Sequence, residues 1–188
     1  MSAAPDRPWH VLVPAVLGPT ERDALLSVAE AIGWTWIDEG DAPRVGPAGY
    51  QSQGGRRQHR AALDDPPLAQ ALWAALRARL PDLPPEDTPV DINPRLRFYA
   101  TVAGGGYPAH TDGAWIVDAR TRSRLTLLVY LTDDFEGGQT WFMDDPRRIQ
   151  PEAGAALVFP HGRWHAGAPV IRGRKVVLRT DLLCEPRP

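Results

Sequence analysis

The chain has 188 residues, with 21 Lys and Arg, 23 Asp and Glu, and a formal net charge of −2. A balance this close to neutral argues against a nucleic-acid or anionic-membrane partner for the chain as a whole, and no stretch approaches the roughly 20 apolar residues of a membrane span. Cys184 is the only cysteine, which excludes an internal disulfide and favours a reducing, cytoplasmic location. The length predicts a single domain over residues 1–188.

Two amphipathic helices are expected in the first half of the chain. Thr20 has the residue type of a helix N-cap, and Gly33 would end that helix. Its apolar stripe comprises Leu25, Val28, Ala29 and Ile32. Asp65 followed by Pro66 predicts a second helix that Pro81 stops. The stripe of this second helix comprises Leu68, Leu72, Ala75, Leu76 and Leu80.

Short apolar strands are expected at residues 10–16 and 34–37. They are followed by Gly40–Arg60, which is rich in glycine and shows no sustained hydrophobic period. A stretch of about 20 residues without secondary structure is unusual in a compact domain. It is either a solvated loop or a lid over a site, in which case its arginines could meet a carboxylate. These arginines are Arg44, Arg56, Arg57 and Arg60.

From Asn93 onward the hydrophobic pattern changes to a period of two, which predicts strands. Leu96, Phe98 and Ala100 would face one side of the sheet, and residues 97, 99 and 101 the other. Further strands are expected at 124–132, 139–143, 155–159 and 174–184, with a turn at 170–173. Helices followed by many short strands indicate a mainly β domain, a sandwich or barrel with flanking helices. Residues 1–92 would carry the helices and the lid loop, and residues 93–184 the β core.

Among the five histidines, His110 stands out because Asp112 follows two residues later, after a glycine-rich turn. On extended backbone the two side chains would leave the same face. A His-X-Asp pair alone is a weak signal. A histidine about 50 residues later, His165, and a basic residue ten further on, Lys175, make it much stronger. Two imidazoles and one carboxylate on a triangular face leave coordination positions of Fe(II) open for a chelating 2-oxo acid and O2.

The second half of the chain resembles the Fe(II)/2-oxoglutarate-dependent oxygenases of the prolyl 4-hydroxylase type. The resemblance covers about residues 93–184. The motifs before residue 145 are Arg-Phe-Tyr at 97–99, His-Thr-Asp at 110–112, the apolar strand at 125–131 and the run that begins Asp-Asp-Phe-Glu-Gly-Gly at 133–142. The later motifs are Pro-Glu-Ala-Gly at 151–154, the ten-residue interval from His165 to Lys175, and Arg-Thr-Asp at 179–181.

The resemblance implies a double-stranded β-helix, the jelly-roll or cupin-like barrel. It implies His110, Asp112 and His165 as ligands of Fe(II), and Lys175 as the partner of the distal carboxylate of 2-oxoglutarate, with Arg179 in reserve. The implied activity is hydroxylation of an unactivated C–H bond with O2 and release of succinate and CO2, with ascorbate as a reductant. The alternative is a catalytically silent cupin-like module that binds a metal or a small acid.

One position departs from the family pattern, because many relatives carry a co-substrate tyrosine where this chain has Thr101. Tyr99, two residues earlier on the same strand face, could substitute, and Tyr130 is a second option. Trp115, in the loop after Asp112, is expected to reach the pocket, with Gly113–Arg122 as a further lid. The substrate, a small molecule, an amino acid or a peptidyl residue, and the oligomeric state are not readable from the sequence.

Overall fold

The computed structural model describes residues 9–40, 56–84, 88–150 and 152–185. Its two helices are α1 (Pro19–Ile32) and α2 (Pro66–Arg77). In chain order, the strands are β1 (Val11–Val13), β2 (Thr35–Asp38), β3 (Arg57–Asp64), β4 (Pro89–Ile92), β5 (Arg95–Val102), β6 (Tyr107–His110), β7 (Arg122–Tyr130), β8 (Glu136–Gly137), β9 (Thr140–Phe142), β10 (Arg148–Ile149), β11 (Ala156–Pro160), β12 (His165–Gly167), β13 (Val170–Arg172) and β14 (Arg174–Cys184).

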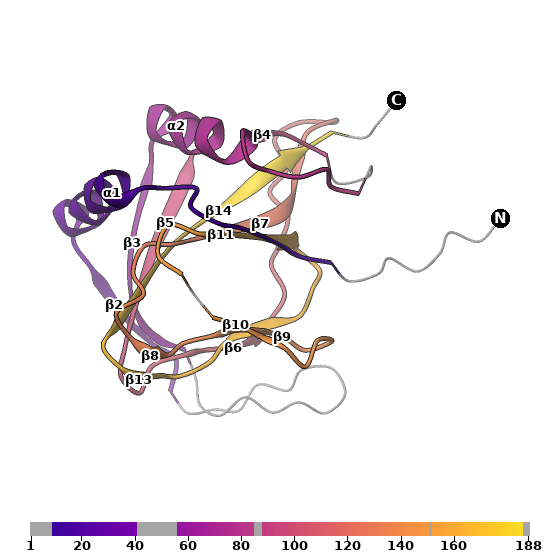
Figure 1. The fold of residues 1–188 in the computed structure, drawn as a ribbon. Coiled ribbons are helices and arrows are strands. Elements are labelled where there is room, and N and C mark those ends of the chain that lie inside the picture. The colour runs from indigo at the N-terminus through magenta and orange to yellow at the C-terminus, as the bar shows by residue number, and fades with distance from the viewer. Residues whose placement is uncertain (1–8, 41–55, 85–87, 151, 186–188) are drawn as a thin grey trace.

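A large and a small sheet lie opposite each other, and both helices pack on the outer face of the large one (Figure 1). The large sheet has the order β1-β11-β7-β14-β5-β3-β2, with β4 pairing β14, and the small sheet has the order β10-β9-β12-β6. The short pair β13 and β8 forms a third sheet. The expected mainly β architecture with flanking helices is confirmed, and the space between the two sheets is where a barrel site would lie.

The helix α2 begins as predicted. The side chain of Asp65 accepts a hydrogen bond from the backbone N–H of Leu68 at 2.9 Å, which satisfies one of the free donors of the first turn. Leu72 and Leu76 of the predicted stripe are buried against the large sheet. The helix ends at Arg77, one turn before Pro81.

The helix α1 differs from its prediction at its N-cap and at the last residue of its apolar stripe. Gly18, not Thr20, occupies the N-cap position, and it makes no side-chain cap because it has no side chain. Leu25 and Ala29 are buried, but Ile32 is 40% exposed because the helix ends there and turns away at Gly33. Neither described helix is long and apolar enough to cross a membrane.

The expected loop Gly40–Arg60 is wrong at its C-terminal end. Residues 57–60 belong to β3, which pairs with β5 and β2 in the large sheet. The polar run Arg57–Arg60 hid this strand, since its buried residues are Gln58 on the cavity side and Ala61 on the helix side rather than large aliphatic side chains. Residues 41–55 of the expected loop lie outside the described part. The turn expected at 170–173 contains the short strand β13.

The strand β7 shows how the large sheet serves two layers. Its residues Leu125, Leu127 and Val129 face the helices and belong to the main apolar core. The alternate residues point to the interior between the sheets, where Tyr130 packs in a second cluster with Phe142 and Phe159. This alternation follows from the period of two in extended backbone.

Candidate active site

His110 and His165 are brought together by strand pairing. His110 is the last residue of β6 and His165 the first residue of β12, and their Cα atoms are direct partners in the antiparallel register. The ring centroids are 4.2 Å apart. Asp112, two residues past His110, lies between them, with Oδ1 3.6 Å from Nε2 of His110 and Oδ2 3.7 Å from Nε2 of His165.

Both imidazoles present the same ring nitrogen to Asp112, because the other nitrogen is bound to backbone. Nδ1 of His110 is 3.0 Å from the carbonyl oxygen of Pro108, and Nδ1 of His165 is 2.9 Å from that of Arg163. A carbonyl oxygen only accepts, so each Nδ1 carries a proton and each Nε2 is the ring nitrogen that faces the cluster. Burial, followed by the neighbouring His110, lowers the pKa of His165 to about 4, which keeps it neutral near pH 7.

Asp112 is held in its ionised form. Burial by itself would raise the pKa of this carboxyl, but the adjacent His110 imidazole and the charge of Arg179 outweigh burial and hold the pKa far below its usual range. The guanidinium of Arg179 is 3.0 Å from Oδ1, and the hydroxyl of Thr126 donates to Oδ2 at 2.5 Å.

A chain of hydrogen bonds supports Asp112 from behind, with each proton fixed by its neighbours. Thr126 gives its proton to Asp112, so it accepts from Nδ1 of His161 at 2.9 Å. Nε2 of His161 therefore accepts from the hydroxyl of Ser123 at 2.9 Å. Ser123 in turn accepts from the backbone N–H of Trp115 at 2.7 Å. The loop after Asp112 is thus connected to the carboxylate itself.

The sequence did not assign His161 and Thr126 to the site. Thr126 shares a strand face with Leu128 and Tyr130, so the period of two was a usable signal for its inward position. No such signal exists for His161. It is placed beside Asp112 by a backbone hydrogen bond, in which the N–H of Asp112 donates to the carbonyl oxygen of His161 at 2.9 Å. His10, another histidine without an apparent partner, stacks on Phe142 with ring centroids 5.0 Å apart.

Lys175 is a buried ammonium with little compensation. Its side chain lies inside the cavity next to the three clustered residues, and it is 8% exposed. Its Nζ donates to the carbonyl oxygen of Gly138 at 2.5 Å, and no carboxylate among the described residues pairs with it. Burial lowers its pKa to about 8. Gly138 has φ +67°, and a Cβ there would meet the ring of Phe135 at 2.9 Å, so only glycine lets this carbonyl approach.

The cavity that contains Lys175 has a volume of about 110 Å³ and is lined on its other sides by the predicted tyrosine and by Arg179. Tyr99 faces it, as does Thr101, whose hydroxyl is 3.4 Å from the Gln58 amide. Tyr130 does not line it. The hydroxyl of that tyrosine is fully buried and engaged with Thr140 at 2.8 Å, and burial raises its pKa.

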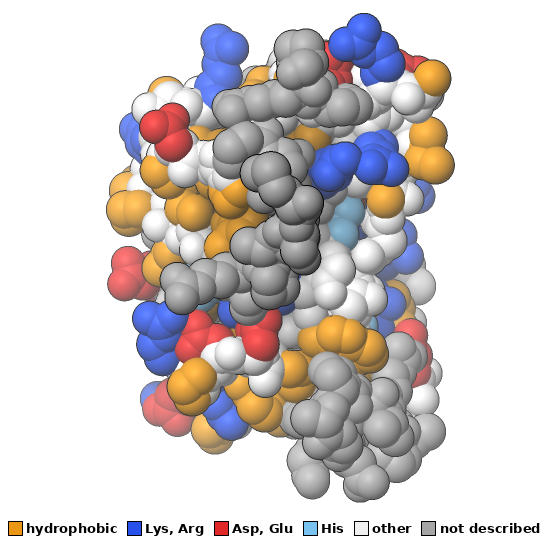
Figure 2. All heavy atoms as spheres, turned by 90° about the vertical axis from the view of Figure 1, so that its right-hand side faces the viewer, with side chains coloured by type: hydrophobic (Ala, Val, Ile, Leu, Met, Phe, Trp, Pro, Cys, Tyr) orange, Lys and Arg blue, Asp and Glu red, His pale blue; other side chains and the backbone are white. Residues whose placement is uncertain are grey.

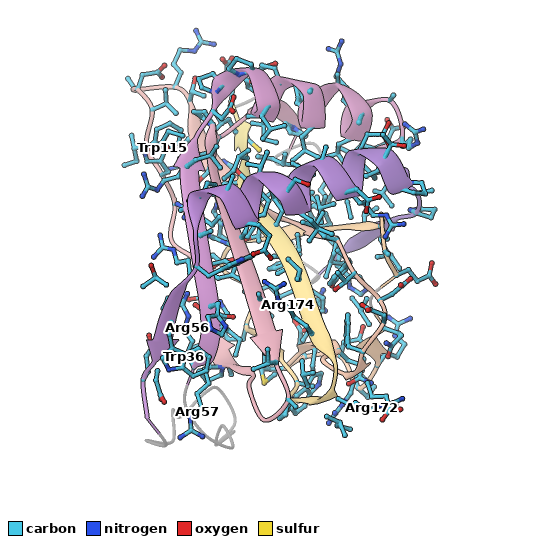
Figure 3. The ribbon with its side chains drawn as sticks, turned by 90° about the vertical axis from the view of Figure 1, so that its left-hand side faces the viewer. Trp36, Arg56, Arg57, Trp115, Arg172 and Arg174 are labelled. Atoms are coloured by element: carbon cyan, nitrogen blue, oxygen red, sulfur yellow. The ribbon has the colours of Figure 1, made fainter. Side chains whose placement is uncertain are left out.

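One arginine of the expected lid lies beside this cavity. The guanidinium of Arg56 stands over the rings of Tyr99 and Tyr107, at 5.3 and 4.8 Å from their centroids. Figure 3 shows Arg56 near Trp36 at one end of the large sheet, and Trp115 near the opposite end. Arg56 and Trp115 therefore lie toward opposite ends of the sheet.

Trp115 borders a second hollow of about 640 Å³, which reaches His110 and Asp112 from the other side. The indole is 42% exposed. The other polar residues of this hollow include Arg97, Arg179 and Asp181. The prediction that Trp115 reaches the pocket therefore holds for this outer hollow, not for the Lys175 cavity.

Part of this chain matches a known family model. Residues 95–180, just under half of the chain, match the model described as the 2OG-Fe(II) oxygenase superfamily. The matched residues include His110, Asp112, His165, Lys175 and Arg179.

The chain is also similar to individual proteins. A PKHD-type hydroxylase of Prochlorococcus marinus (strain MIT 9313) is 26% identical over 84 residues, which are 44% of this chain and 38% of that protein, so the chain aligns with well under half of the relative's length. The viral collagen prolyl hydroxylase of Paramecium Bursaria Chlorella virus-1 superposes with a TM-score of 0.65 at 18% identity, over 95% of this chain and 98% of that one. A prolyl-4-hydroxylase of Pseudomonas putida gives a TM-score of 0.63 at 18% identity, over 96% and 94%. These structures share the double-stranded β-helix fold, which confirms the predicted fold class.

The residues at the oxygenase site fit ferrous iron and a 2-oxo acid. The three ligand atoms of His110, Asp112 and His165 lie within 4.8 Å of one another, which is the spacing that one ion can span. Two neutral imidazoles and one carboxylate are the donor set of non-haem Fe(II) sites with open positions. Lys175, with no carboxylate partner, fits the far end of a dicarboxylate.

Proposed function

We propose that the protein is a non-haem Fe(II)- and 2-oxoglutarate-dependent oxygenase that hydroxylates an unactivated C–H bond of a small molecule, an amino acid or a peptidyl residue. Succinate and CO2 are released. His110, Asp112 and His165 hold the iron in this proposal. What supports it is one observation: the three clustered ligands and Lys175, a buried ammonium without a carboxylate partner among the described residues, line the same cavity.

Each residue has a distinct task in this proposal. The two imidazoles offer Nε2 lone pairs that are already oriented, because their Nδ1 protons are bound to backbone carbonyls. Thr126 and Arg179 fix the Asp112 carboxylate, so little ordering is required when the ion binds. Bound iron, 2-oxoglutarate and O2 would supply the oxidising chemistry.

The co-substrate end of the cavity works by charge. Lys175 donates to one carboxylate of 2-oxoglutarate while Gly138 keeps its ammonium in position. Tyr99 lines the same cavity and is the tyrosine we assign to the co-substrate. Arg179 contributes to the field without being the first contact, since its guanidinium is already between Asp112 and Asp181, 3.0 Å from each.

The test is turnover of 2-oxoglutarate by protein loaded anaerobically with Fe(II) and then exposed to air. Succinate, measured by NMR, should form, and His110→Ala should abolish both its formation and Fe(II) retention. The matched control is His59→Ala, since His59 lies on β3 against Trp36 and lines neither cavity. Equal loss in the two variants would contradict the assignment of His110.

A silent binding module remains the second candidate, since the same residues could hold a metal without turnover. It predicts that the protein retains Fe(II) through His110 but never converts 2-oxoglutarate to succinate, whatever substrate is offered. Ascorbate, added as a reductant, should prolong turnover in an oxygenase and change nothing in a binding module.

We also infer that residues 1–188 act as one domain in a reducing, cytoplasmic setting. From the first 92 residues, β1 pairs with β11 and β3 pairs with β5 of the later part, which supports one folding unit. Cys184, the only cysteine of the sequence, is buried. A single cooperative unfolding transition in calorimetry, and localisation of a tagged full chain, test these two inferences.

A further inference from the structure

The outer hollow carries a charge arrangement that the chemistry at the metal does not require. It is lined by Arg97 and Arg179 on one wall, by Trp115 and its preceding loop on another, and by His110 and Asp112 at its inner end. On the face drawn in Figure 2, a histidine side chain is visible from outside, close to a group of Lys and Arg side chains. A volume of about 640 Å³ is within the range of small-molecule sites.

Two arginines share one carboxylate at the inner wall. Asp181 is 3% exposed, and its Oδ1 lies 3.0 Å from Arg179 while its Oδ2 lies 3.5 Å from Arg97. Oδ2 is also 3.0 Å from the amide nitrogen of Asn93, which donates to it. Asp112, the other carboxylate near Arg179, is committed to the metal in the proposed function.

Arg97 is the less satisfied of the two arginines. Among the described residues, its polar contact is with Asp181 at 3.5 Å, and a guanidinium has five N–H donors. Its side chain is 18% exposed, and that exposure is toward the hollow it lines. Its neighbour Arg95 differs, because it forms an exposed pair with Asp64 at 2.8 Å and is 47% exposed.

The charges of the wall do not cancel. Arg97 and Arg179 bring two positive charges, and Asp181 returns one. The pair Arg95 and Asp64 is neutral by itself. In the proposed enzyme Asp112 and the two carboxylates of 2-oxoglutarate balance the ferrous ion and Lys175. One guanidinium therefore faces the hollow without a counter-charge, in a setting where water is partly excluded.

We propose that the outer hollow binds the substrate that the enzyme oxidises, and that this substrate is a small organic acid. Its carboxylate would lie on the free N–H groups of Arg97 and its apolar body against Trp115. This inference rests on the proposed function of the metal centre, and it names the substrate class for it. Arg97 is then a specificity-determining residue. A planar guanidinium suits a carboxylate because it donates two parallel hydrogen bonds.

The experiment measures carboxylate preference directly, without turnover. Full-length protein is loaded with Mn(II) and saturated with N-oxalylglycine, a 2-oxoglutarate mimic that blocks the Lys175 end. A panel of N-acetyl amino acids with apolar side chains is then titrated by calorimetry, each acid beside its primary amide. We expect the best acid to bind about tenfold or more tightly than its amide, the gain typical of a charge-assisted hydrogen bond.

The variants decide whether Arg97 causes this preference. Arg97→Met should reduce the acid-to-amide ratio to about one, and Arg97→Lys should restore part of it. Arg95→Met is the matched control, since it removes a positive charge from the same hollow without touching Asp181, and its ratio should stay within about twofold of the unmodified protein. Melting temperatures identify any variant that fails to fold. If Arg97→Met does not fold, the comparison of Arg97→Lys with the unmodified protein replaces it.

Three outcomes would overturn the inference: acids and amides that bind equally, a preference that survives in Arg97→Met, or no binding by any acid of the panel. The failure of the proposed function looks different. If Fe(II)-loaded protein forms no succinate but the acid preference and its loss in Arg97→Met are both seen, the hollow is an organic-acid site on a silent module. If succinate forms and no acid preference exists, the oxygenase stands and its substrate is not an acid.

Discussion

The two faces of the large sheet are built from the same strands, but one face is apolar and the other carries polar and charged side chains. Toward the helices, β5, β7 and β14 present Leu, Val, Phe and Ala side chains that are fully buried. Toward the small sheet, the same strands present Thr126, Lys175 and Arg179. Buried polar and charged groups cost free energy unless they are compensated, whereas buried apolar groups contribute it.

This difference separates stability from function within a single layer of backbone. The helix face can carry the folding free energy because its packing is apolar and continuous. The inner face can then hold a histidine pair, an ionised carboxylate and a lysine without a carboxylate partner. Mutations of apolar residues on the helix face should therefore lower stability, and mutations on the inner face should lower ligand affinity.

The largest effect on stability is expected from Leu76→Ala on α2. Leu76 is completely buried against the large sheet. Truncating such a side chain to alanine lowers the free energy of unfolding by about 2–5 kcal/mol. Urea unfolding should show this loss, while 2-oxoglutarate turnover per folded molecule should stay unchanged at low temperature. A fall in turnover that matches the fall in stability would show that the two faces are not separable.

Lys175→Met should act in opposite directions on stability and on affinity. Its folded pKa of about 8 lies below the unfolded value of 10.5, so the charged lysine destabilises the free protein. The substitution should raise the free energy of unfolding at pH 7 by up to about 3 kcal/mol and weaken 2-oxoglutarate binding about 10- to 100-fold.

The pH dependence gives the sign of the lysine effect. Between about pH 8 and pH 10.5 the unfolded chain binds more protons at this position than the folded one, so the stability contributed by this residue rises with pH in that window. Affinity for 2-oxoglutarate should fall over the same window, because the neutral amine no longer pairs with a carboxylate. Lys175→Met should lack both trends, and persistence of either trend would count against this assignment.

Thr126→Val should weaken metal binding about 10- to 100-fold with little change in fold. The substitution keeps the side-chain shape but removes the hydroxyl that connects Asp112 to His161. Titration of Mn(II) followed by electron paramagnetic resonance measures the affinity. Thr126→Ser should recover most of it, and a valine variant with unchanged affinity would show that the hydrogen-bond chain does not position Asp112.

The smallest effect is expected from Asp65→Ala at the start of α2. Losing the bond to the backbone N–H of Leu68 should cost about 1 kcal/mol of stability. Metal affinity and turnover should not change, because this cap lies on the helix side of the sheet. Differential scanning calorimetry with Leu76→Ala as the larger reference makes the comparison quantitative.

Much of the helix face was readable in advance because periodicity and capping are local. The stripe of α2, its Asp65 cap and the alternation of β5 were predicted from neighbouring residues alone. The strand β3 was missed because its buried positions carry a polar and a small residue, Gln58 and Ala61. The N-cap of α1 was misplaced because Gly18 and Pro19 set the start instead of Thr20.

The sequence by itself determined the chemistry available: a His-X-Asp pair, a distant histidine and a lysine ten residues beyond it. Only the tertiary structure decided that these groups meet, because the register that pairs β6 with β12 sets His165 opposite His110 across 55 positions of chain. The hydrogen-bond chain through His161 and the shared carboxylate between Arg97 and Arg179 also depend on that folding. Spacing along a chain limits which residues can share a strand face, but contacts between strands depend on how the sheets close around the core.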